Sequence, residues 1–292
     1  MDQRRIGDWH VSAIGLGAMP MSVRDTNDEE RGVATIHAAL DAGVTLIDTA
    51  DAYSIDEASF GHNEELIARA LREYAGATDD VLVATKGGHT RRGSDWELDG
   101  RPAYLREACL ASMRRLGVDR IDLYQHHRPD PSVPYDETIG GLKPLLDEGL
   151  IAAAGISNAD PEQIRLAHQI LGDGLVAVQN QFSPAFRSSQ PEVEVCAELG
   201  LAFLAWSPLG GMSKAADLGD QWQAFATTAA KHGVSPQQVC LAWELALSDA
   251  VIPIPGASRP ESIRDSVTAV DLVLDEDDLA ALSGGRHRNP TL

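Results

Sequence analysis

The 292-residue sequence has little positive charge, few cysteines and few aromatic side chains. Lysine and arginine number 24 against 44 aspartates and glutamates, which gives a formal net charge of −20. A surface of that sign repels nucleic acid and anionic membranes, so we expect binding to neither. The cysteines Cys109, Cys196 and Cys240 show no metal-ligand spacing, and we expect all three to be reduced core residues.

The chain also lacks long apolar runs. Residues 1–8 contain no apolar signal core, and no window approaches the ~20 apolar residues that cross a bilayer. We therefore expect a cytoplasmic protein with no membrane partner. A hydrophobic content of 43 % is nevertheless enough for a large buried core.

Strand-like and helix-like segments alternate along the chain after a short polar hairpin at residues 4–12. Short apolar runs predict strands at 13–17, 44–48, 80–86, 120–126, 150–156, 175–179, 201–206 and 250–254. Periodic patterns predict helices at 28–42, 61–74, 101–116, 136–148, 161–171, 189–199, 221–232, 236–247 and 260–268, with a last helix opened by Asp275.

This alternation predicts a (β/α)₈ TIM barrel with a short N-terminal β-hairpin, built as a single domain over residues 1–292. A doubly wound open sheet is the alternative fold. That fold commonly carries a GxGxxG sequence where its first helix opens, and Gly15-Leu-Gly17 is instead followed by a polar loop. The barrel is the better interpretation.

Four ionisable residue types lie at the ends of predicted strands. Asp48 and Lys86 each end an apolar run, Tyr53 follows five residues after Asp48, and a pair, His126-His127, ends a third run. The carboxyl ends of barrel strands converge on one face, where an acid, a phenol, an amine and an imidazole would form a proton-transfer site. Taken singly, each residue has an ordinary explanation as a helix cap, a surface aromatic or a solvated charge.

An ordered set of short motifs gives a more specific indication. The set is Asp48-Thr-Ala-Asp-Ala-Tyr53, Gly61-His-Asn-Glu64, Thr85-Lys86, Asp122-Leu-Tyr-Gln-His-His-Arg-Pro-Asp130, Gly155-Ile-Ser-Asn158, Val178-Gln-Asn180, Trp206-Ser-Pro-Leu-Gly210 and Ile254-Pro-Gly256. In this order, from about residue 10 to residue 283, the chain resembles the aldo-keto reductases. The resemblance implies reduction of an aldehyde or ketone with NADPH, without a metal.

The resemblance assigns a catalytic role to four residues. Tyr53 matches the general acid, Lys86 the neighbouring ammonium, and Asp48 the carboxylate that pairs with the lysine. An ammonium beside a phenol lowers its pKa from the usual value of about 10. His127 matches the imidazole that positions the carbonyl oxygen, whereas His126 is expected to be a satisfied core histidine or a supporting group.

The resemblance also implies a cofactor site. Ser157, Asn158 and Gln179 match residues that bind the nicotinamide carboxamide, and Trp206 matches an aromatic residue stacked on the nicotinamide face. The loop expected near the pyrophosphate contains Ser207, Leu209 and Gly211.

The segment expected to hold the adenosine 2′-phosphate departs from the family pattern. Gly256, Ser258, Arg259 and Asp265 lie there, and a basic signature present in many relatives is missing. Arg259 is the remaining cation, which binds phosphate or pairs with a surface carboxylate such as Glu261. We expect Asp265 to lie near the adenine and NADPH to be preferred over NADH.

Substrate choice is expected to depend on loops at the barrel mouth. The candidates are residues 19–23, 90–100, 128 and 182–186. Trp96, in the second of these segments, is either a pocket wall or a loop anchor.

The leading functional hypothesis is the NADPH-dependent, reversible reduction of a small carbonyl substrate, with the proton delivered by Tyr53. The alternative is an NADPH-binding regulatory subunit of the same fold with little turnover, and a third is a lyase that uses Lys86 as a nucleophile. The sequence is compatible with a homo-oligomer and indicates none.

Overall fold

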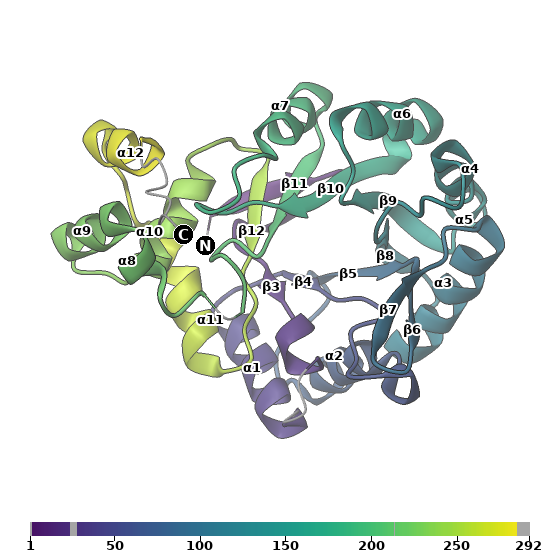
Figure 1. The fold of residues 1–292 in the computed structure, drawn as a ribbon. Coiled ribbons are helices and arrows are strands. Elements are labelled where there is room, and N and C mark those ends of the chain that lie inside the picture. Colours follow the sequence, from purple (N-terminus) through teal and green to yellow (C-terminus); the bar gives the residue numbers. More distant parts are fainter. Residues whose placement is uncertain (1, 24–27, 213, 285–292) are drawn as a thin grey trace.

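The structure, a computed structural model, describes residues 2–23, 28–212 and 214–284. Its centre is an eight-stranded sheet of parallel strands, enclosed by helices (Figure 1). The strands, in chain order, are β3 (Leu16–Gly17), β4 (Leu46–Asp48), β5 (Leu82–Gly87), β8 (Ile121–His126), β9 (Ile151–Ser157), β10 (Leu175–Gln181), β11 (Ala202–Trp206) and β12 (Val251–Ile254).

Contacts between the first and last strands close the sheet into a barrel. Gly17 bridges to Gly256 in parallel register, and its backbone N–H donates to the Pro255 carbonyl at 3.0 Å. The chains approach so closely that a Cβ on Gly17 would lie 2.8 Å from the Ile254 carbonyl oxygen. The predicted (β/α)₈ barrel is confirmed.

The barrel interior is filled by one apolar side-chain cluster. Leu46, Leu82, Leu204 and Ile252 from four strands pack with Ile6, which comes from the N-terminal hairpin. That hairpin consists of β1 (Gln3–Ile6) and β2 (Trp9–Ser12), as the sequence predicts. Because it packs on the inner cluster, the hairpin covers the end of the barrel where the strands begin.

The described helices surround the barrel. They are α1 (Glu29–Asp41), α2 (His62–Glu73), α3 (Pro102–Leu116), α4 (Tyr135–Gly140), α5 (Lys143–Asp147), α6 (Pro161–Leu171), α7 (Gln190–Leu199), α8 (Leu218–Gln221), α9 (Gln223–His232), α10 (Pro236–Leu245), α11 (Pro260–Val267) and α12 (Glu276–Ser283). Side-chain caps fix several starts; the Asp160 carboxylate, for example, accepts from the backbone N–H of Gln163 in a capping box before α6.

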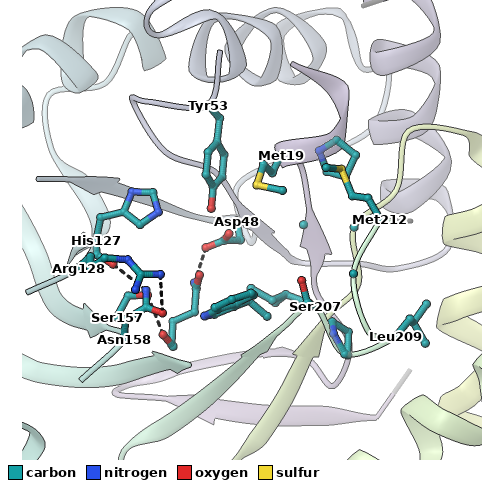
Figure 2. A pocket seen from close by; sticks show the side chains of 18 of the residues that line it. Met19, Asp48, Tyr53, His127, Arg128, Ser157, Asn158, Ser207, Leu209 and Met212 are labelled. Atoms are coloured by element: carbon teal, nitrogen blue, oxygen red, sulfur yellow. Dashed lines mark hydrogen bonds between the residues drawn. The ribbon is translucent and has the colours of Figure 1, made fainter. Parts of the chain in front are cut away.

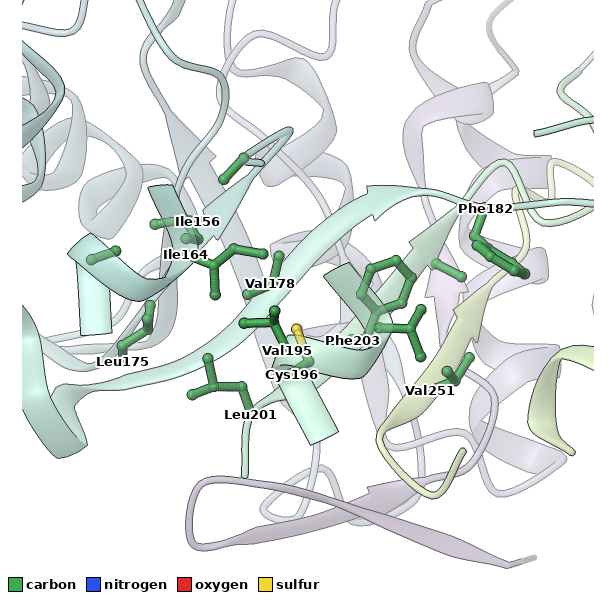
Figure 3. Packing of buried hydrophobic residues seen from close by; sticks show 14 of the residues in the cluster. Ile156, Ile164, Leu175, Val178, Phe182, Val195, Cys196, Leu201, Phe203 and Val251 are labelled. Atoms are coloured by element: carbon green, nitrogen blue, oxygen red, sulfur yellow. The ribbon is translucent and has the colours of Figure 1, made fainter. Parts of the chain in front are cut away.

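A second apolar layer lies between the strands and the helices. Val178 and Phe203 point outward from β10 and β11 and belong to one cluster with Val195 and Cys196 of α7 (Figure 3). All three cysteines are buried and free, as predicted.

Two local predictions were wrong. The single helix expected at 136–148 is two short helices, because Gly140 and Gly141 weaken the turn between them and Pro144 cannot donate a helical hydrogen bond. Residues 90–100, treated as a loop, include most of a hairpin, β6 (His89–Arg92) and β7 (Asp95–Leu98), joined through Gly93 at φ +56°. This hairpin pairs only with itself.

No helix within the described part of the chain is long and apolar enough to cross a bilayer.

Candidate active site

A fully paired ammonium group lies at the carboxyl end of β5. Lys86 is completely buried, and its Nζ atom lies 2.7 Å from Asp48 Oδ2, 2.8 Å from the Thr49 carbonyl and 3.0 Å from Tyr53 Oη. Burial lowers the pKa of Lys86, but the Asp48 carboxylate and the Tyr53 oxygen outweigh it, so the pKa is raised overall. All three ammonium hydrogens have partners, and the lysine is held charged in one orientation.

The Asp48 carboxylate is held from its other side by two amides. Gln179 Nε2, on β10, lies 2.6 Å from Asp48 Oδ1, and Gln125 Nε2, on β8, lies 3.4 Å from the same oxygen. Three strands therefore fix this carboxylate, and its negative charge balances the lysine in a site shielded from water.

Tyr53 is the phenol that faces the pocket next to this ion pair. Burial raises the pKa of Tyr53 above its usual value, while the Lys86 ammonium acts in the opposite direction. The sequence argument considered only the ammonium and expected a lowered pKa; desolvation is the larger effect here. The phenol therefore keeps its proton at neutral pH.

The two adjacent histidines lie in different surroundings. The His127 ring is 5.6 Å from the Tyr53 ring, lines the pocket and has a buried Nδ1 without a hydrogen-bond partner. Burial, and then Lys86, hold the pKa of His127 well below its ordinary value, so the imidazole is neutral. The choice of His127 as the histidine beside Tyr53 agrees with this geometry.

His126 points away from the pocket and is fully buried near Tyr135 of α4, with 6.3 Å between ring centroids. Neither of its ring nitrogens has a partner, and burial lowers the pKa of His126 to about 4. The expectation of a satisfied core histidine was wrong, because no described polar group reaches the ring.

The pocket at this barrel mouth has a cavity volume of about 330 Å³. Figure 2 shows His127 and Arg128 on one side of it, and Ser207, Leu209 and Met212 on the other. Its lining includes eleven of the predicted site residues, which come from the strands or the loops after them: Asp48, Tyr53, His127, Ser157, Asn158, Gln179, Trp206, Ser207, Leu209, Gly211 and Gly256.

A group of polar side chains follows β9 along the pocket wall. Asn158 has φ +58°, an uncommon conformation for a residue other than glycine, and its Nδ2 atom donates to the His127 carbonyl and to Ser157 Oγ. The Ser157 hydroxyl in turn donates to the Gln179 carbonyl at 2.7 Å. These bonds lock Asn158, and its amide oxygen accepts from Arg128 Nη2 at 3.1 Å.

Trp206 and Ser207 form the wall beyond this group. Ser207 also has a positive φ, of 51°, and Trp206 has a buried indole N–H without a partner. An aromatic face and backbone held in an uncommon conformation are typical of a binding surface.

A second cavity adjoins the first and continues the groove outward. The two share Pro20, Leu209, Met212, Ala215 and Gly256 among their lining residues. Gly256, Ser258, Arg259 and Asp265, the residues predicted for the phosphate and adenine end, all line the second cavity.

The charges of this outer cavity differ from those at the inner end. Arg259 is exposed, and no ion pair links it to Glu261 or to another described residue. Asp265 accepts hydrogen bonds from Ser235 Oγ at 2.8 Å and Gln238 Nε2 at 2.7 Å, so both of its oxygens have partners.

Sequence reasoning missed Arg31, which also lines the outer cavity. Its Nε atom donates to the Ser258 carbonyl at 3.2 Å, and an ion pair of 3.6 Å joins it to Asp28. Arg31 is 228 positions from Arg259 in the chain, and no local pattern relates the two. Only barrel closure, which places α1 against α11, brings them together.

The β6–β7 hairpin supplies the substrate-side wall. His89 and Trp96 both line the pocket, and the His89 ring lies 4.3 Å from the His127 ring. Trp96 is therefore a pocket wall, covered on one face by the Arg91 guanidinium 3.5 Å from its ring centroid. The sequence did not suggest His89.

No residue of the segment 182–186, predicted to border the substrate, lines this cavity. Phe182 is 1 % exposed and stacks on Trp243 of α10, with 5.8 Å between ring centroids. It belongs to the outer core, because β10 directs this side chain toward the helices.

Within the described residues, no three His, Cys, Asp or Glu side chains gather as a metal site would require. The chemistry available at the pocket is proton transfer by a neutral phenol beside an ammonium, next to a neutral imidazole.

Comparisons with known proteins agree with this site. The model of the Aldo/keto reductase family matches residues 13–284. A Glycine max protein named "Probable aldo-keto reductase 1" is 33 % identical, over 96 % of this chain and 90 % of that protein.

Solved structures give the same result. The glycerol dehydrogenase of Gluconobacter oxydans superposes with a TM-score of 0.83 at 28 % identity, covering 100 % of this chain and 98 % of its own. An aldo/keto reductase from Klebsiella pneumoniae, solved in complex with NADP and acetate, has a TM-score of 0.81 at 29 % identity, with 97 % and 94 % coverage.

The chain therefore belongs to the aldo-keto reductase family, a family of oxidoreductases that act on small carbonyl compounds. The resemblance that its motifs indicated is confirmed.

Proposed function

We propose that this protein reduces an aldehyde or ketone to an alcohol with NADPH, reversibly, and that Tyr53 delivers the proton. The observation that carries the proposal is the contact of Lys86 Nζ with both Asp48 and Tyr53, beside His127 and at the base of an open pocket. This intact arrangement argues against a protein that only binds the cofactor.

The groove fits a nicotinamide dinucleotide. At its inner end, Trp206 offers a ring face, and Asn158 and Gln179 offer amide groups for a carboxamide. At its outer end, Arg259 and Arg31 offer cations for phosphate. The NADP in the structure of the Klebsiella pneumoniae relative supports this choice of cofactor.

The catalytic residues would act on the carbonyl oxygen. NADPH, when bound, supplies the hydride for the carbonyl carbon. Tyr53 Oη gives its proton to the oxygen, and the Lys86 ammonium stabilises the phenolate that remains. His127, neutral and beside Tyr53, donates a hydrogen bond that orients the same oxygen.

Asp48 would keep Lys86 protonated through the cycle, and the Gln179 and Gln125 amides would hold Asp48 in place. This pairing also argues against Lys86 as a Schiff-base nucleophile. All three ammonium hydrogens are bonded and the pKa of Lys86 is raised, whereas a nucleophilic lysine requires a free amine.

Two measurements test the proposal. Quenching of tryptophan fluorescence reports binding of NADPH, and loss of NADPH absorbance reports turnover with a panel of aldehydes. We expect Tyr53→Phe to lower kcat by about 10²–10⁴-fold, the usual contribution of a general acid. The affinity for NADPH should stay within about twofold, because the phenol acts on the carbonyl.

Tyr74→Phe is the matched control, since the Tyr74 hydroxyl bonds to Asp41 at the exposed surface. It should retain wild-type kcat. Near wild-type turnover in Tyr53→Phe would contradict the assignment of the proton donor. Tight NADPH binding without turnover of any aldehyde would instead support the regulatory-subunit alternative.

A further inference from the structure

The side chains that line the inner pocket leave one positive charge unbalanced. The titratable side chains on its wall are Asp48, Tyr53, His89, His127 and Arg128. The Asp48 charge is balanced by Lys86, and burial lowers the pKa values of both histidines, that of His89 to about 4. Arg128 is thus the one lining residue whose charge has no counterion among the described residues.

The Arg128 guanidinium has a neutral hydrogen-bond partner and no ion pair among the described residues. It is exposed and donates to the neutral Asn158 Oδ1 at 3.1 Å, and no described carboxylate lies within 4.0 Å of it. Arg165, an exposed arginine away from the pocket, instead binds both Glu198 oxygens at 2.9 and 2.6 Å. In a chain of net charge −20, an arginine without a carboxylate partner at the pocket is available to a ligand.

Arg128 lies beside the residues that would bind the carbonyl group of the substrate. Arg128 directly follows His127, and Figure 2 shows both on one side of the pocket, with Tyr53 approaching from above. A carbonyl oxygen bound between Tyr53 and His127 would have its substituent next to Arg128. The rest of the pocket wall is largely apolar and includes Met19 and Trp96.

We propose that the substrate is an aldehyde or ketone that carries a carboxylate, and that Arg128 binds this carboxylate. The proposal rests on the proposed reductase function. A guanidinium presents two parallel N–H groups that match the two oxygens of a carboxylate. One arginine neutralises one carboxylate, whereas a phosphate dianion would keep an unbalanced charge in an acidic protein.

Pairs of substrates that differ only in charge test this assignment. We would compare 3- and 4-formylbenzoate with their methyl esters under saturating NADPH. For whichever formylbenzoate isomer is the better substrate, the wild type should have a kcat/KM about tenfold or more above that for the matching methyl ester. This is the difference expected for a charge-assisted hydrogen bond. Arg128→Met should abolish that acid-to-ester ratio, and Arg128→Lys should retain part of it.

Arg165→Met is the matched control, because it removes an exposed, paired arginine away from the pocket. It should leave the ratio unchanged. Since Arg128 also bonds to Asn158, a purely structural role would lower kcat/KM for acid and ester alike and keep their ratio. That result, or a wild type that does not distinguish acid from ester, would overturn the proposal.

Binding separates this proposal from the reductase function. Calorimetry with 4-(hydroxymethyl)benzoate and its methyl ester, with NADPH present, measures affinity in a combination that cannot react. Preference for the acid, lost in Arg128→Met, would support carboxylate binding even if no aldehyde were reduced, in which case only the reductase function would fail. Equal affinities in wild type and Arg128→Met would overturn the role of Arg128.

Discussion

The two ends of the groove hold their cations in opposite ways. At the inner end, Lys86 is completely buried and contacts Asp48, Thr49 and Tyr53, so its charge is balanced within the protein. At the outer end, Arg259 is exposed and pairs with no described carboxylate, and Arg31 makes one long ion pair.

The difference follows from what each charge would do. A buried ammonium without a carboxylate would lose its proton, so a lysine that must stabilise a phenolate needs a permanent partner. A cation that binds a ligand phosphate must instead stay hydrated and available until the ligand arrives. Under the proposed function, the paired cation at the inner end would serve the chemistry, and the unpaired cation at the outer end would serve cofactor binding.

The largest expected effect comes from breaking the inner pair. Lys86→Met should lower kcat/KM by about 10²-fold or more, because Tyr53 loses its stabilising cation. It should also lower the free energy of unfolding by about 3–5 kcal/mol, because the Asp48 carboxylate remains buried and unpaired. Aldehyde reduction and denaturant unfolding measure the two effects.

Lys143→Met is the control for stability. Lys143 pairs with Asp147 four residues along α5 at 3.3 Å, and 56 % of its side chain is exposed, so its loss should cost about 0.5 kcal/mol or less. The double variant Asp48→Asn/Lys86→Met should recover stability without recovering activity. A stable, active Lys86→Met enzyme would contradict the role of the buried pair.

The next effect concerns the outer end. Arg259→Ala should weaken NADPH binding about 10–100-fold while the affinity for NADH changes about twofold or less, because only NADPH carries a 2′-phosphate. Arg31→Ala should act in the same direction with a smaller loss, since Arg31 is partly engaged by Asp28. Fluorescence titration of both cofactors checks this.

Fluorescence titration of both cofactors at several ionic strengths gives a further test. The NADPH preference should decrease as salt screens the exposed arginines, whereas the buried contacts of Lys86 should respond little. Equal losses for NADPH and NADH in Arg259→Ala would show that this residue does not bind the 2′-phosphate.

The smallest effect comes from a buried acid that lacks a cation. Glu244 of α10 is fully buried, both of its carboxylate oxygens lack a described partner, and burial holds the pKa of Glu244 well above its usual value. A raised pKa in the folded state means that stability is lost as pH rises through that pKa. Glu244→Gln should therefore raise Tm at pH 8 by a few degrees, equivalent to about 1–2 kcal/mol.

Near pH 4 the difference between Glu244→Gln and wild type should vanish, because the wild-type carboxyl is then protonated in both states. Glu107→Gln, at an exposed position of α3, should show no such pH-dependent gain. A variant that is less stable than wild type at pH 8 would indicate a hidden partner for Glu244.

Much of this molecule could be predicted from its sequence, since the barrel and the inner site depend on local patterns. Asp48 and Lys86 end apolar strands, and parallel strands bring their ends together. The predicted helix 161–171 agrees with α6 because its cap and the proline after it are local signals. The ordered motifs then placed Tyr53 and His127.

The sequence-based predictions that failed concerned features with weak local signals or features that depend on tertiary structure. The β6–β7 strands are polar, so their alternation was not recognised, although Gly93-Ser94 is a two-residue hairpin signal. The pKa of Tyr53 depends on how deeply the phenol is buried, and the role of Arg31 depends on barrel closure. Neither the depth at which Tyr53 is buried nor the place of Arg31 beside the outer cavity can be predicted from the residues next to them in the sequence.

The self-paired β6–β7 hairpin has a consequence for how this enzyme could acquire new substrates. Its strands pair only with each other, His89 and Trp96 reach the pocket, and Arg91 donates to the Ala52 and Ser54 carbonyls on either side of Tyr53. Residues 89–98 other than Arg91 can therefore be exchanged without disturbing the register of any barrel strand. Directed evolution confined to this segment, with Arg91 retained, would vary substrate selectivity while the contacts among Asp48, Tyr53 and Lys86 stay constant.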